Sequence, residues 1–554
     1  MTAAPAVRSE PRERGRIAIG IDFGTESGRV LLLDLDAGDE LAVAVVPYSH
    51  GVIDRALPST GAELPPDWAL QDPEDWMAVV EQGVPQALAQ AGADAQKIVG
   101  LGVDFTSCTV LPASAEGAPL CTLEAWRARP HAWPKLWKHH AAQAVADRLT
   151  ETAEARGDSF LSRYGGRISS EWYFPKLIEI WLEDREVYDA TGAFLEATDW
   201  IVWWLTGQER RQMCTAGYKA LWSPDEGLPP TDYFTAAYPG FDRPDEKLGT
   251  TFLPLGTCAG TLRAELAERL GLPADVAVAV GNVDSFVSVP GAGVDRAGVF
   301  VGVIGTSTCD MVIDDREVRL PGITGVLRDG ILPGRYGYEA GQAAVGDMLG
   351  WLVRRIAVGR DFADLERAAA EIAPGETGLV ALDWWNGNRT ILADADLTGA
   401  ILGLTLSTSV EHIYRALLES IAFGNRRIME NFVEHGVPLH EIVACGGIAH
   451  RSPLLMQLLA DTSGVPVIVP ASTEIPARGS ALFGAVAAGI YATIEAAVAA
   501  TRPAEAHRYE PDPDAKQTYD RVYAIYRDLY ELLGRSRVEL LHELKAIRTE
   551  RRTP

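Results

Sequence analysis

The amino-acid sequence predicts an α/β protein built from two domains of like topology. The chain has 554 residues, more than a single hydrophobic core usually organises. Apolar runs typical of buried strands alternate along it with segments of helical spacing. An apolar run, a Gly-Thr turn and a second apolar run open the chain, and the same pattern recurs near residue 300. Similarity at such long range indicates a duplicated domain rather than a solenoid of short repeats.

Composition and charge narrow the classes of partner. Apolar residues make up 47% of the chain and charged ones 23%, which is ordinary for a globular protein. The net charge of −26 would repel a polyanion, so we expect no nucleic-acid partner. No apolar run is long and uninterrupted enough for a membrane helix, so we expect no membrane partner. Small anions such as nucleotides remain compatible, because a local cradle of backbone N–H groups binds them.

Cysteine usage and the first residues favour the cytoplasm. Six cysteines are scattered without a Cys-x-x-Cys pair, so neither a disulfide framework nor a zinc site is predicted. The opening "MTAAPAVRSEPRERGR" mixes basic residues with two prolines and two glutamates, and no apolar core of a signal peptide follows it. We therefore expect residues 1–15 to form a flexible N-terminal tail.

The elements of the first half alternate between strands and helices. The stretch "IGIDFGTESGRVLLLDLD" from Ile19 is a strand, a turn and a second strand, and "ELAVAVVPY" from Glu40 adds a third. The segment 73–92 has the spacing of a helix, and "KIVGLGVDFTSCTVLPA" at 97–113 reads as strand, turn and strand.

The second half repeats the order of predicted elements found in the first half. A strand, a Gly-Asn turn and an acid occupy 273–289, and "AGVFVGVIGTSTCDMVID" at 297–314 repeats the opening hairpin. The segment 441–470 has a βαβ pattern, and "ARGSALFGAVAAGIY" after it is a small-residue helix suited to close packing. From 511 to 548 the spacing predicts one long amphipathic helix that packs on the body or on a partner subunit.

The two Gly-Thr turns are candidate phosphate sites. A turn of glycine and hydroxyl residues at a strand end presents N–H and O–H donors to one point, which suits phosphate oxygens. Asp22, at the end of the first strand, could hold Mg²⁺ directly or through water. The alternative is that the glycines only permit tight hairpins. Neither a Walker loop nor a dinucleotide-binding fingerprint occurs, so another phosphate-binding fold is required. The candidate nucleotide-binding residues are Thr25 and Glu26 in the first turn and Thr306 and Ser307 in the second.

Paired Gly-Thr hairpins and a late Gly-Gly turn resemble the superfamily of sugar kinases, hexokinase, Hsp70 and actin. Within it, "SSEWYFPKLIEIWLED" from Ser169 resembles the first signature of the FGGY carbohydrate kinases, and the order of segments matches from about residue 16 to 495. The resemblance implies two similar ribonuclease H-like (actin/hexokinase-type) domains with a cleft between them. Its expected divisions are a sugar-binding domain, a nucleotide-binding domain and a C-terminal helical extension, at 16–285, 286–495 and 496–554.

Further stretches are similar to the ribulokinase group of that family. They include "PHAWPKLWKHHAAQ", "RYGGRISSEWYFPK", "EATDWIVWWLTG", "IGTSTCDM" and "GYEAGQAAVGD". The resemblance implies phosphorylation of a ketopentose, L-ribulose in arabinose catabolism, at its terminal hydroxyl, with ATP and Mg²⁺ as cofactors. A homodimer is left open as the assembly.

The resemblance also implies roles for single residues. Asp284, in "GNVD", would be the general base, and a carboxylate directly after a strand is well placed for that role; the alternative is a turn cap that bonds nearby N–H groups. Lys219 and Glu339 would bind the sugar. The nucleotide would contact Gly446 and Gly447 in "ACGGIAHRSP", where glycines let the backbone approach closely; the alternative is a strand-to-helix turn without a ligand. Asn425, on the preceding helix, is a further candidate for the nucleotide, although polar residues on helices usually face solvent.

One position departs from the family pattern and keeps other substrates open. Members of the ribulokinase group usually read "DFTAC" where this chain has "DFTSC", so Ser107 adds a hydroxyl to the sugar pocket. A kinase for another ketopentose or a pentitol (D-ribulose, xylulose, ribitol) is therefore the second hypothesis. An ATP-driven binding protein of the actin or chaperone type is the third, and it would turn over ATP without sugar.

Overall fold

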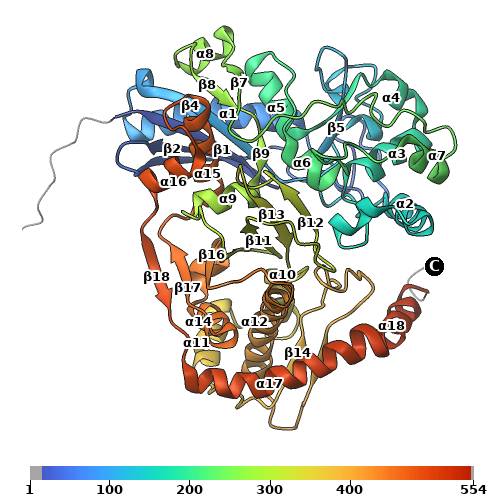
Figure 1. The fold of residues 1–554 in the computed structure, drawn as a ribbon, viewed down its shortest axis with the longest axis vertical. Helices are drawn as coiled ribbons and strands as arrows, with labels where there is room; N and C mark the ends of the chain where they lie inside the picture. The colour runs from blue at the N-terminus through green and yellow to red at the C-terminus, as the bar shows by residue number, and fades with distance from the viewer. Residues whose placement is uncertain (1–14, 551–554) are drawn as a thin grey trace, which may run out of the picture.

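Two seven-stranded sheets dominate the protein in the computed structural model, which describes residues 15–550 (Figure 1). The strand order of the first sheet is β3-β2-β1-β4-β8-β7, and β9 also pairs with β4. That of the second is β12-β13-β11-β10-β16-β17-β18. The strands of the first sheet are β1 (Ile17–Phe23), β2 (Ser27–Asp34), β3 (Glu40–Pro47), β4 (Ile98–Phe105), β7 (Cys258–Thr261), β8 (Ala277–Ala279) and β9 (Asn282–Val283). Those of the second are β10 (Val299–Ile304), β11 (Thr308–Asp314), β12 (Gly325–Arg328), β13 (Tyr336–Ala340), β16 (Glu441–Cys445), β17 (Val467–Pro470) and β18 (Glu505–Tyr509).

The two sheets match strand for strand, which confirms the predicted duplication. In each, an antiparallel meander of three strands is followed by two parallel strands and an antiparallel edge strand. The second sheet carries one extra strand, β12. Two small ribbons lie outside the sheets, β5 (Val110–Ala113) with β6 (Ala193–Glu196) and β14 (Val380–Leu382) with β15 (Ala400–Leu402).

Helices cover both sheets and fill the long insertions. The predicted helix at 73–92 is α1, capped by the Asp72 side chain at its start and by Gly92 in the left-handed conformation at its end. The first half contains α1 (Pro73–Ala91), α2 (Gln143–Arg156), α3 (Tyr173–Glu183), α4 (Arg185–Ala190), α5 (Ala197–Thr206), α6 (Met213–Lys219), α7 (Thr231–Ala237), α8 (Ala264–Leu270) and α9 (Asp284–Gly291). The second contains α10 (Gly346–Arg355), α11 (Phe362–Ala370), α12 (Val410–Glu434), α13 (Gly447–Arg451), α14 (Pro453–Ser463), α15 (Ile475–Ala487), α16 (Ile494–Thr501), α17 (Pro513–Glu531) and α18 (Glu539–Glu550).

The small-residue helix α15 belongs to the second half of the sequence but packs on the first sheet (Figure 1). The contact is so close that a Cβ on Gly20 of β1 would lie 1.7 Å from the carbonyl oxygen of Ala477. On its other side α15 meets α9, where a Cβ on Gly479 would lie 1.9 Å from the carbonyl oxygen of Val287. Glycine is required at both contacts, and the two halves are joined through this tightly packed layer.

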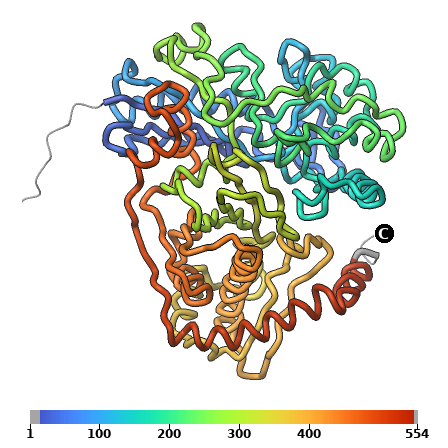
Figure 2. Tube along the Cα trace, in the orientation of Figure 1, coloured from blue at the N-terminus to red at the C-terminus, as the bar shows by residue number. Residues whose placement is uncertain are grey.

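The C-terminal segment differs from the single long helix that the spacing predicts. It first adds β18 to the edge of the second sheet, then forms α17 and α18, separated by a short π-helical turn at Leu532–Ser536. Figure 2 shows this segment running from the N-terminal half down one side and then beneath the second half. Four buried tyrosines at helical spacing fix α17 to the body, namely Tyr519, Tyr523, Tyr526 and Tyr530.

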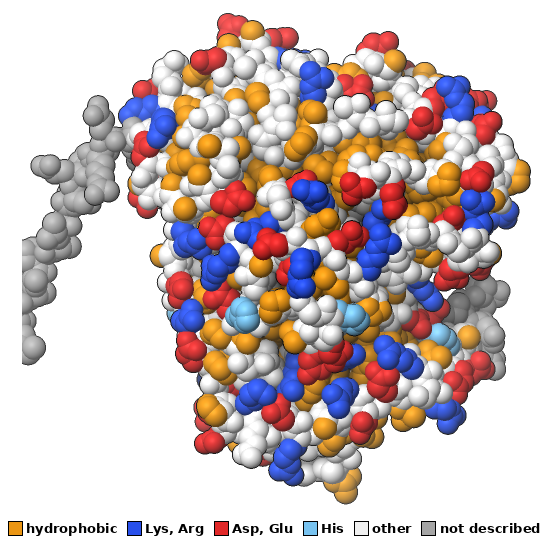
Figure 3. Space-filling model, in the orientation of Figure 1, with side chains coloured by type: hydrophobic (Ala, Val, Ile, Leu, Met, Phe, Trp, Pro, Cys, Tyr) orange, Lys and Arg blue, Asp and Glu red, His pale blue; other side chains and the backbone are white. Residues whose placement is uncertain are grey.

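Other expectations meet the structure as follows. All six cysteines are free. Within residues 15–550, no helix is both long and apolar enough to cross a membrane. The predicted tail at 1–15 falls, except for its last residue, outside the described residues. Figure 3 shows acidic and basic side chains interspersed over the visible face, with apolar side chains gathered in a band across its upper half.

Candidate active site

Three carboxylates lie together at the ends of neighbouring parallel strands. Asp22 is at the end of β1 and pairs in register with Asp104 of β4. The short strand β9 pairs with the same end of β4, Asn282 opposite Asp104, so the next residues begin α9 with Asp284. The carboxyl ends of parallel strands are where ligands bind in many α/β folds. The fold thus gathers three acids that are far apart in sequence.

The first two acids form a strained pair. Asp104 is completely buried, and burial together with the charge of Asp22 holds its pKa well above the usual range. Burial also raises the pKa of Asp22, even though an Arg29 guanidinium nitrogen lies 3.4 Å away. Ser480 of α15 donates to Asp104 Oδ2 over 2.5 Å, whereas Asp104 Oδ1 has no partner among the described residues.

Asp284 is the more accessible of the three acids. It is the first residue of α9 and only partly buried, and its Oδ1 accepts a hydrogen bond of 2.6 Å from the N–H of Ser285. Burial of the carboxyl and the charge of Asp22 raise its pKa to about 7. Its charge also acts on the thiol of Cys309, two residues beyond Ser307. Asp284 is therefore near enough to both the acid pair of the first sheet and the hairpin of the second to interact with their side chains.

An ion pair beside Asp284 joins the two halves. Lys219, at the end of α6, donates through Nζ to Glu339 Oε2 of β13 over 2.6 Å, and both residues are buried. Burial alone would lower the pKa of Lys219, because it disfavours the charged ammonium. The charge and hydrogen bond of Glu339 outweigh burial, so the pKa of Lys219 is raised. Both charges act on Asp284. The structure thus brings together the predicted sugar-binding pair and the predicted base.

Ser107 lies on the turn between β4 and β5, next to this ion pair. The following residue, Cys108, has a φ of 64°, which is unfavourable for residues other than glycine. Its thiol lies 3.7 Å from the Ser107 hydroxyl, and the Lys219 ammonium acts on the same thiol. Within residues 15–550, the hydroxyl of Ser107 has only this weak sulfur donor as a hydrogen-bond partner.

Both Gly-Thr hairpins form the predicted tight turns. In the first, the N–H of Gly24 bonds the carbonyl of Ser27 over 3.0 Å, and Trp137 Nε1 donates to Thr25 Oγ1 over 3.2 Å. The Thr25 O–H stays free to donate elsewhere, and Glu26 is exposed. In the second, the N–H of Gly305 bonds the carbonyl of Ser307 over 2.9 Å, and the neighbouring Thr306 is exposed.

The predicted glycine pair lies against the second hairpin. Gly446 follows β16 with a φ of 88°, and a Cβ there would lie 2.6 Å from the carbonyl oxygen of Ile304. Gly447 is the first residue of α13. Asn425 is placed differently, buried in the middle of α12 with its Oδ1 unpartnered among the described residues. Its predicted contact with the nucleotide stays a prediction.

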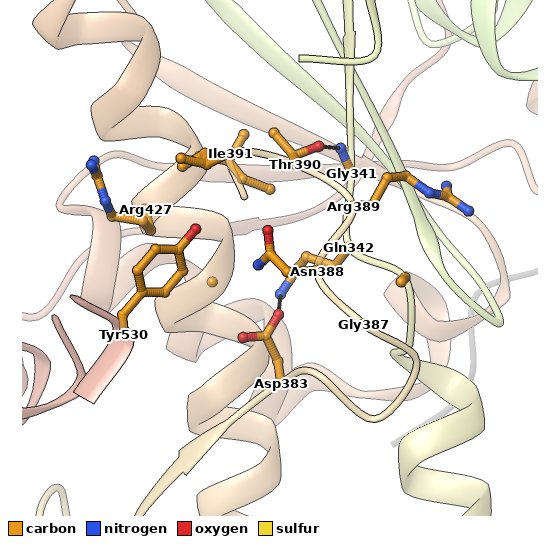
Figure 4. A pocket seen from close by; sticks show the side chains of 13 residues that line it. Gly341, Gln342, Asp383, Gly387, Asn388, Arg389, Thr390, Ile391, Arg427 and Tyr530 are labelled. Carbon is orange, nitrogen blue, oxygen red and sulfur yellow. Dashed lines mark hydrogen bonds between the residues drawn. The ribbon is translucent and has the colours of Figure 1, made fainter. Parts of the chain in front are cut away.

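A cavity of about 10 Å³, room for one water, lies among the segments 341–343 and 387–391 and the helices α12 and α17 (Figure 4). Gln342 lines it, donating to Asp383 over 2.8 Å through its side chain and to the Thr308 hydroxyl through its N–H. Tyr526 of α17 donates to the same Asp383 carboxylate. The C-terminal helix is thereby tied by hydrogen bonds to the residue that follows Ser307. Arg389 points away from this cavity.

Sequence reasoning missed three charged residues of this site. Asp104 had a signal, because "DF" followed by a small or hydroxyl residue ends both apolar runs, at 22–23 and at 104–105. Arg389 acts electrostatically on Glu171, Glu339 and Asp310, although it lies far along the chain in an insertion. Glu171 lies inside the "SSEWYF" signature and acts on Lys219. Nothing local distinguishes the last two from surface charges.

The acid pair fits a magnesium ion. Residues 15–550 contain no cluster of three or more His, Cys, Asp and Glu side chains arranged for a metal. Magnesium at a nucleotide commonly takes only one or two carboxylates and completes its shell with phosphates and water. The pair Asp22 and Asp104 supplies that number, and the unpartnered Asp104 Oδ1 is a buried acceptor without a donor.

Comparisons with known proteins agree with this architecture. The N-terminal domain model of the FGGY family of carbohydrate kinases matches residues 17–291, and the C-terminal domain model matches residues 300–488. The ribulokinase of Halalkalibacterium halodurans is 46% identical, covering 97% of this chain and 99% of its own. The ribulokinase of Mycolicibacterium smegmatis is 43% identical, covering 96% and 97%.

A solved structure has the same arrangement of the two halves. The xylulose kinase of Rhodospirillum rubrum superposes with a TM-score of 0.78 at 25% identity, over 95% of this chain and all of that one. With both domain models matched and relatives aligned from end to end, the chain belongs to the FGGY family of carbohydrate kinases.

Proposed function

We propose that this protein is a ribulokinase, which transfers the γ-phosphate of ATP to the 5-hydroxyl of L-ribulose and yields L-ribulose 5-phosphate and ADP in L-arabinose catabolism. The observation that carries the proposal is that Asp284 is near enough to the Asp22–Asp104 pair and to the Lys219–Glu339 pair for charges of both to act on it. The high identity to relatives named ribulokinase supports L-ribulose as the sugar.

Asp284 is the general base of the proposed reaction. Its carboxylate accepts the proton of the 5-hydroxyl as that oxygen attacks the γ-phosphorus in line with the leaving ADP oxygen. A pKa of about 7 suits the task, because the group is a carboxylate in about half of the molecules at neutral pH and still a strong enough base. The bond from Ser285 N–H to Oδ1 leaves Oδ2 to receive the proton.

The two hairpins and the acid pair hold the phosphates. Thr25, Thr306 and Ser307, with the backbone N–H groups of their turns, donate to phosphate oxygens, and Gly446 and Gly447 let the nucleotide approach the backbone of the second half. Asp22 and Asp104 are the residues that would hold Mg²⁺, which neutralises charge on the phosphates when bound. Glu26 and Asn425 complete the proposed nucleotide contacts.

The sugar is held beside the base. Lys219 and Glu339 are one cation and one anion side by side, so a ketose can accept a hydrogen bond from the ammonium and donate one to the carboxylate. Ser107 supplies a hydroxyl at the edge of the same group. We expect the enzyme to act in the cytoplasm.

The alternatives separate by substrate. A kinase for D-ribulose, xylulose or ribitol keeps the same chemistry, and Ser107 is the feature that favours it. An ATP-driven binding protein of the actin or chaperone type is disfavoured by membership of a carbohydrate kinase family.

One assay tests the proposal. ADP release is measured with MgATP against L-ribulose, D-ribulose, xylulose and ribitol. We expect turnover to require sugar and kcat/KM to be highest for L-ribulose. A higher kcat/KM for another sugar would replace the substrate, and ADP release indifferent to sugar would overturn the kinase itself.

A further inference from the structure

The turn that carries Ser107 is held from behind by two buried charged residues. The turn runs from Thr106 to Thr109, between β4 and β5, and its central residue Cys108 is almost completely buried. Lys176 approaches it from α3 and Glu196 from the end of β6. None of the steps described above uses either residue.

Lys176 binds the carbonyl side of the turn. Its side chain is fully buried, and Nζ donates to the carbonyl oxygen of Cys108 over 2.5 Å. The same ammonium donates to the carbonyls of Leu136 and Lys135 over 2.9 and 3.3 Å. Three N–H donors thus meet three backbone acceptors, which ties the turn to the neighbouring segment.

Glu196 binds the amide side of the same turn. Its carboxylate lies close enough to the backbone N–H groups of Cys108 and Thr109 for both to lower its pKa. The residue is buried, and one carboxylate oxygen, Oε1, has no hydrogen-bond partner among the described residues. The charges of Lys176 and Lys219 both act on it. Cys108 therefore has an anion near its N–H and a cation that donates a hydrogen bond to its carbonyl.

The turn needs this support. A φ of 64° at Cys108 places a side chain in the sparsely populated left-handed region, and such residues persist where the surroundings over-determine them. Burial removes water as an alternative partner for the same N–H and carbonyl groups. Without the two charges, the conformation that presents Ser107 would compete with relaxed ones.

We propose that Lys176 and Glu196 are positioning residues that fix the Ser107–Cys108 turn against the ketose, so that affinity for sugar, and not for ATP, depends on them. This inference rests on the proposed function for the identity of the sugar. Neither residue touches the substrate in the proposal; both act through the backbone of the turn.

The contacts of Lys176 and Glu196 with the Ser107–Cys108 turn, called the clamp below, should be strongest over a limited range of pH. Burial lowers the pKa of Lys176 to about 8 and raises that of Glu196 to about 7. Above pH 8 the neutral amine offers two N–H donors to three carbonyls, and below pH 7 the neutral acid is a poorer acceptor for two amides. The groups that act on Lys176 are Cys108, Glu196, Glu171, Lys135 and His139. Those around Glu196 are Lys176, Lys219, Cys108, Tyr173 and Asp199. We expect the KM for sugar to be lowest between these values.

The first test is Lys176→Met in the full-length enzyme. We expect the KM for ketopentose to rise about 10-fold or more, with kcat changed less than about 3-fold and the KM for ATP unchanged, because the turn is displaced and the phosphate site is not. Lys135→Met is the matched control. That lysine is equally buried in the same domain, but its side chain pairs with Glu179 instead of the turn. Equal rises of sugar KM in both variants would overturn the proposal.

The second test is Glu196→Gln, which keeps a carbonyl acceptor for the amides and removes the charge. With that anion gone, the pKa of Lys176 falls, and the rise of sugar KM at alkaline pH should move about one pH unit lower. A general loss of stability would not move this limb. If Glu196→Gln folds and the pH dependence of its KM for sugar is unchanged, the clamp is refuted. This test does not depend on whether Lys176→Met folds.

A readout without substrate separates the two proposals. Hydrogen exchange of the peptide covering 106–113 should quicken in Lys176→Met at pH 7.5 while peptides of the second sheet stay unchanged. Wild-type protein that phosphorylates none of the four sugars would refute the proposed function and leave this exchange result to decide the clamp. Unchanged exchange at 106–113 refutes the clamp.

Discussion

The ends of the central strands carry different side chains in the two halves, although the hairpins around them are alike. In the first sheet the residues facing each other across β1 and β4 are Asp22 and Asp104. The equivalent pair in the second sheet, across β10 and β16, is Val303 and Cys445. After β16 the chain continues with Gly446 in a left-handed conformation. One topology thus supplies charge in one half and close backbone approach in the other.

The difference follows from what each environment costs. Two adjacent buried carboxylates are costly, because burial and the charge of Asp22 both raise the pKa of Asp104. A cation held by this pair, as proposed for Mg²⁺, would offset that cost. An apolar pair needs no such compensation and leaves only backbone donors at the second turn. We infer that the first half provides charged side chains for the reaction, and that the second half binds the nucleotide through its backbone.

The largest effect should come from the base. Asp284→Asn removes the proton acceptor while keeping its size, and we expect kcat to fall about 10²- to 10⁴-fold, measured by ADP release with ketopentose. Asp275→Asn is the control, since that residue is exposed just before β8. A fall of less than about 3-fold would assign Asp284 to capping α9.

The acid pair should control the need for metal. Asp22→Asn and Asp104→Asn each remove one carboxylate, and the Mg²⁺ concentration for half-maximal rate should rise about 10-fold or more. Because Asp104→Asn also relieves repulsion, the melting temperature without metal should not fall. Val303→Ala, at the matching place in the second half, should leave the Mg²⁺ requirement unchanged. An equal rise of the Mg²⁺ requirement in Val303→Ala would contradict the proposal that the first half provides the charged side chains.

The pH dependence of rate should report Asp284. Its folded pKa is raised to about 7, and the reaction needs the deprotonated form, so kcat at saturating sugar should fall about tenfold per unit below pH 7 and level off above it. A profile flat from pH 7 to pH 5 contradicts this assignment. The acid limb should be absent from the residual activity of Asp284→Asn.

The glycines of the second half should affect ATP rather than metal. Gly446→Ala places a Cβ 2.6 Å from the Ile304 carbonyl at a φ of 88°, so we expect the KM for ATP to rise about 10-fold with some loss of stability. Gly447→Ala meets only the flexible end of Arg451 and should change that KM less. A rise in the KM for sugar instead would move the nucleotide site elsewhere.

The smallest effect is expected from Ser107→Ala. Removing one hydroxyl from the sugar pocket should change the ratio of kcat/KM between L-ribulose and the other ketopentoses by about 2- to 10-fold. The same assay panel measures it. An identical ratio in the variant would show that the departure at this position does not tune substrate choice.

Local pattern was enough to predict most single elements. The hairpins around Gly24 and Gly305, the helix that begins after Asp72 and the βαβ unit at 441–470 all follow from periodicity and turn residues, and all are confirmed. Strand β18 could not be found this way, because four of its five residues are exposed and it lacks apolar alternation. The single C-terminal helix was wrong because helical spacing continues through the turn at Leu532–Ser536 that divides it.

The sequence by itself determined two strand–turn–strand units and a carboxylate after "GNV", because hydrophobic period and turn chemistry act over a few residues. Only the tertiary structure decided that Asp104 stands beside Asp22, that Lys219 meets Glu339 from 120 positions away, and that α15 lies on the sheet of the other half. Strand register and close packing at glycines set those neighbours, and both depend on which distant segments are buried against each other.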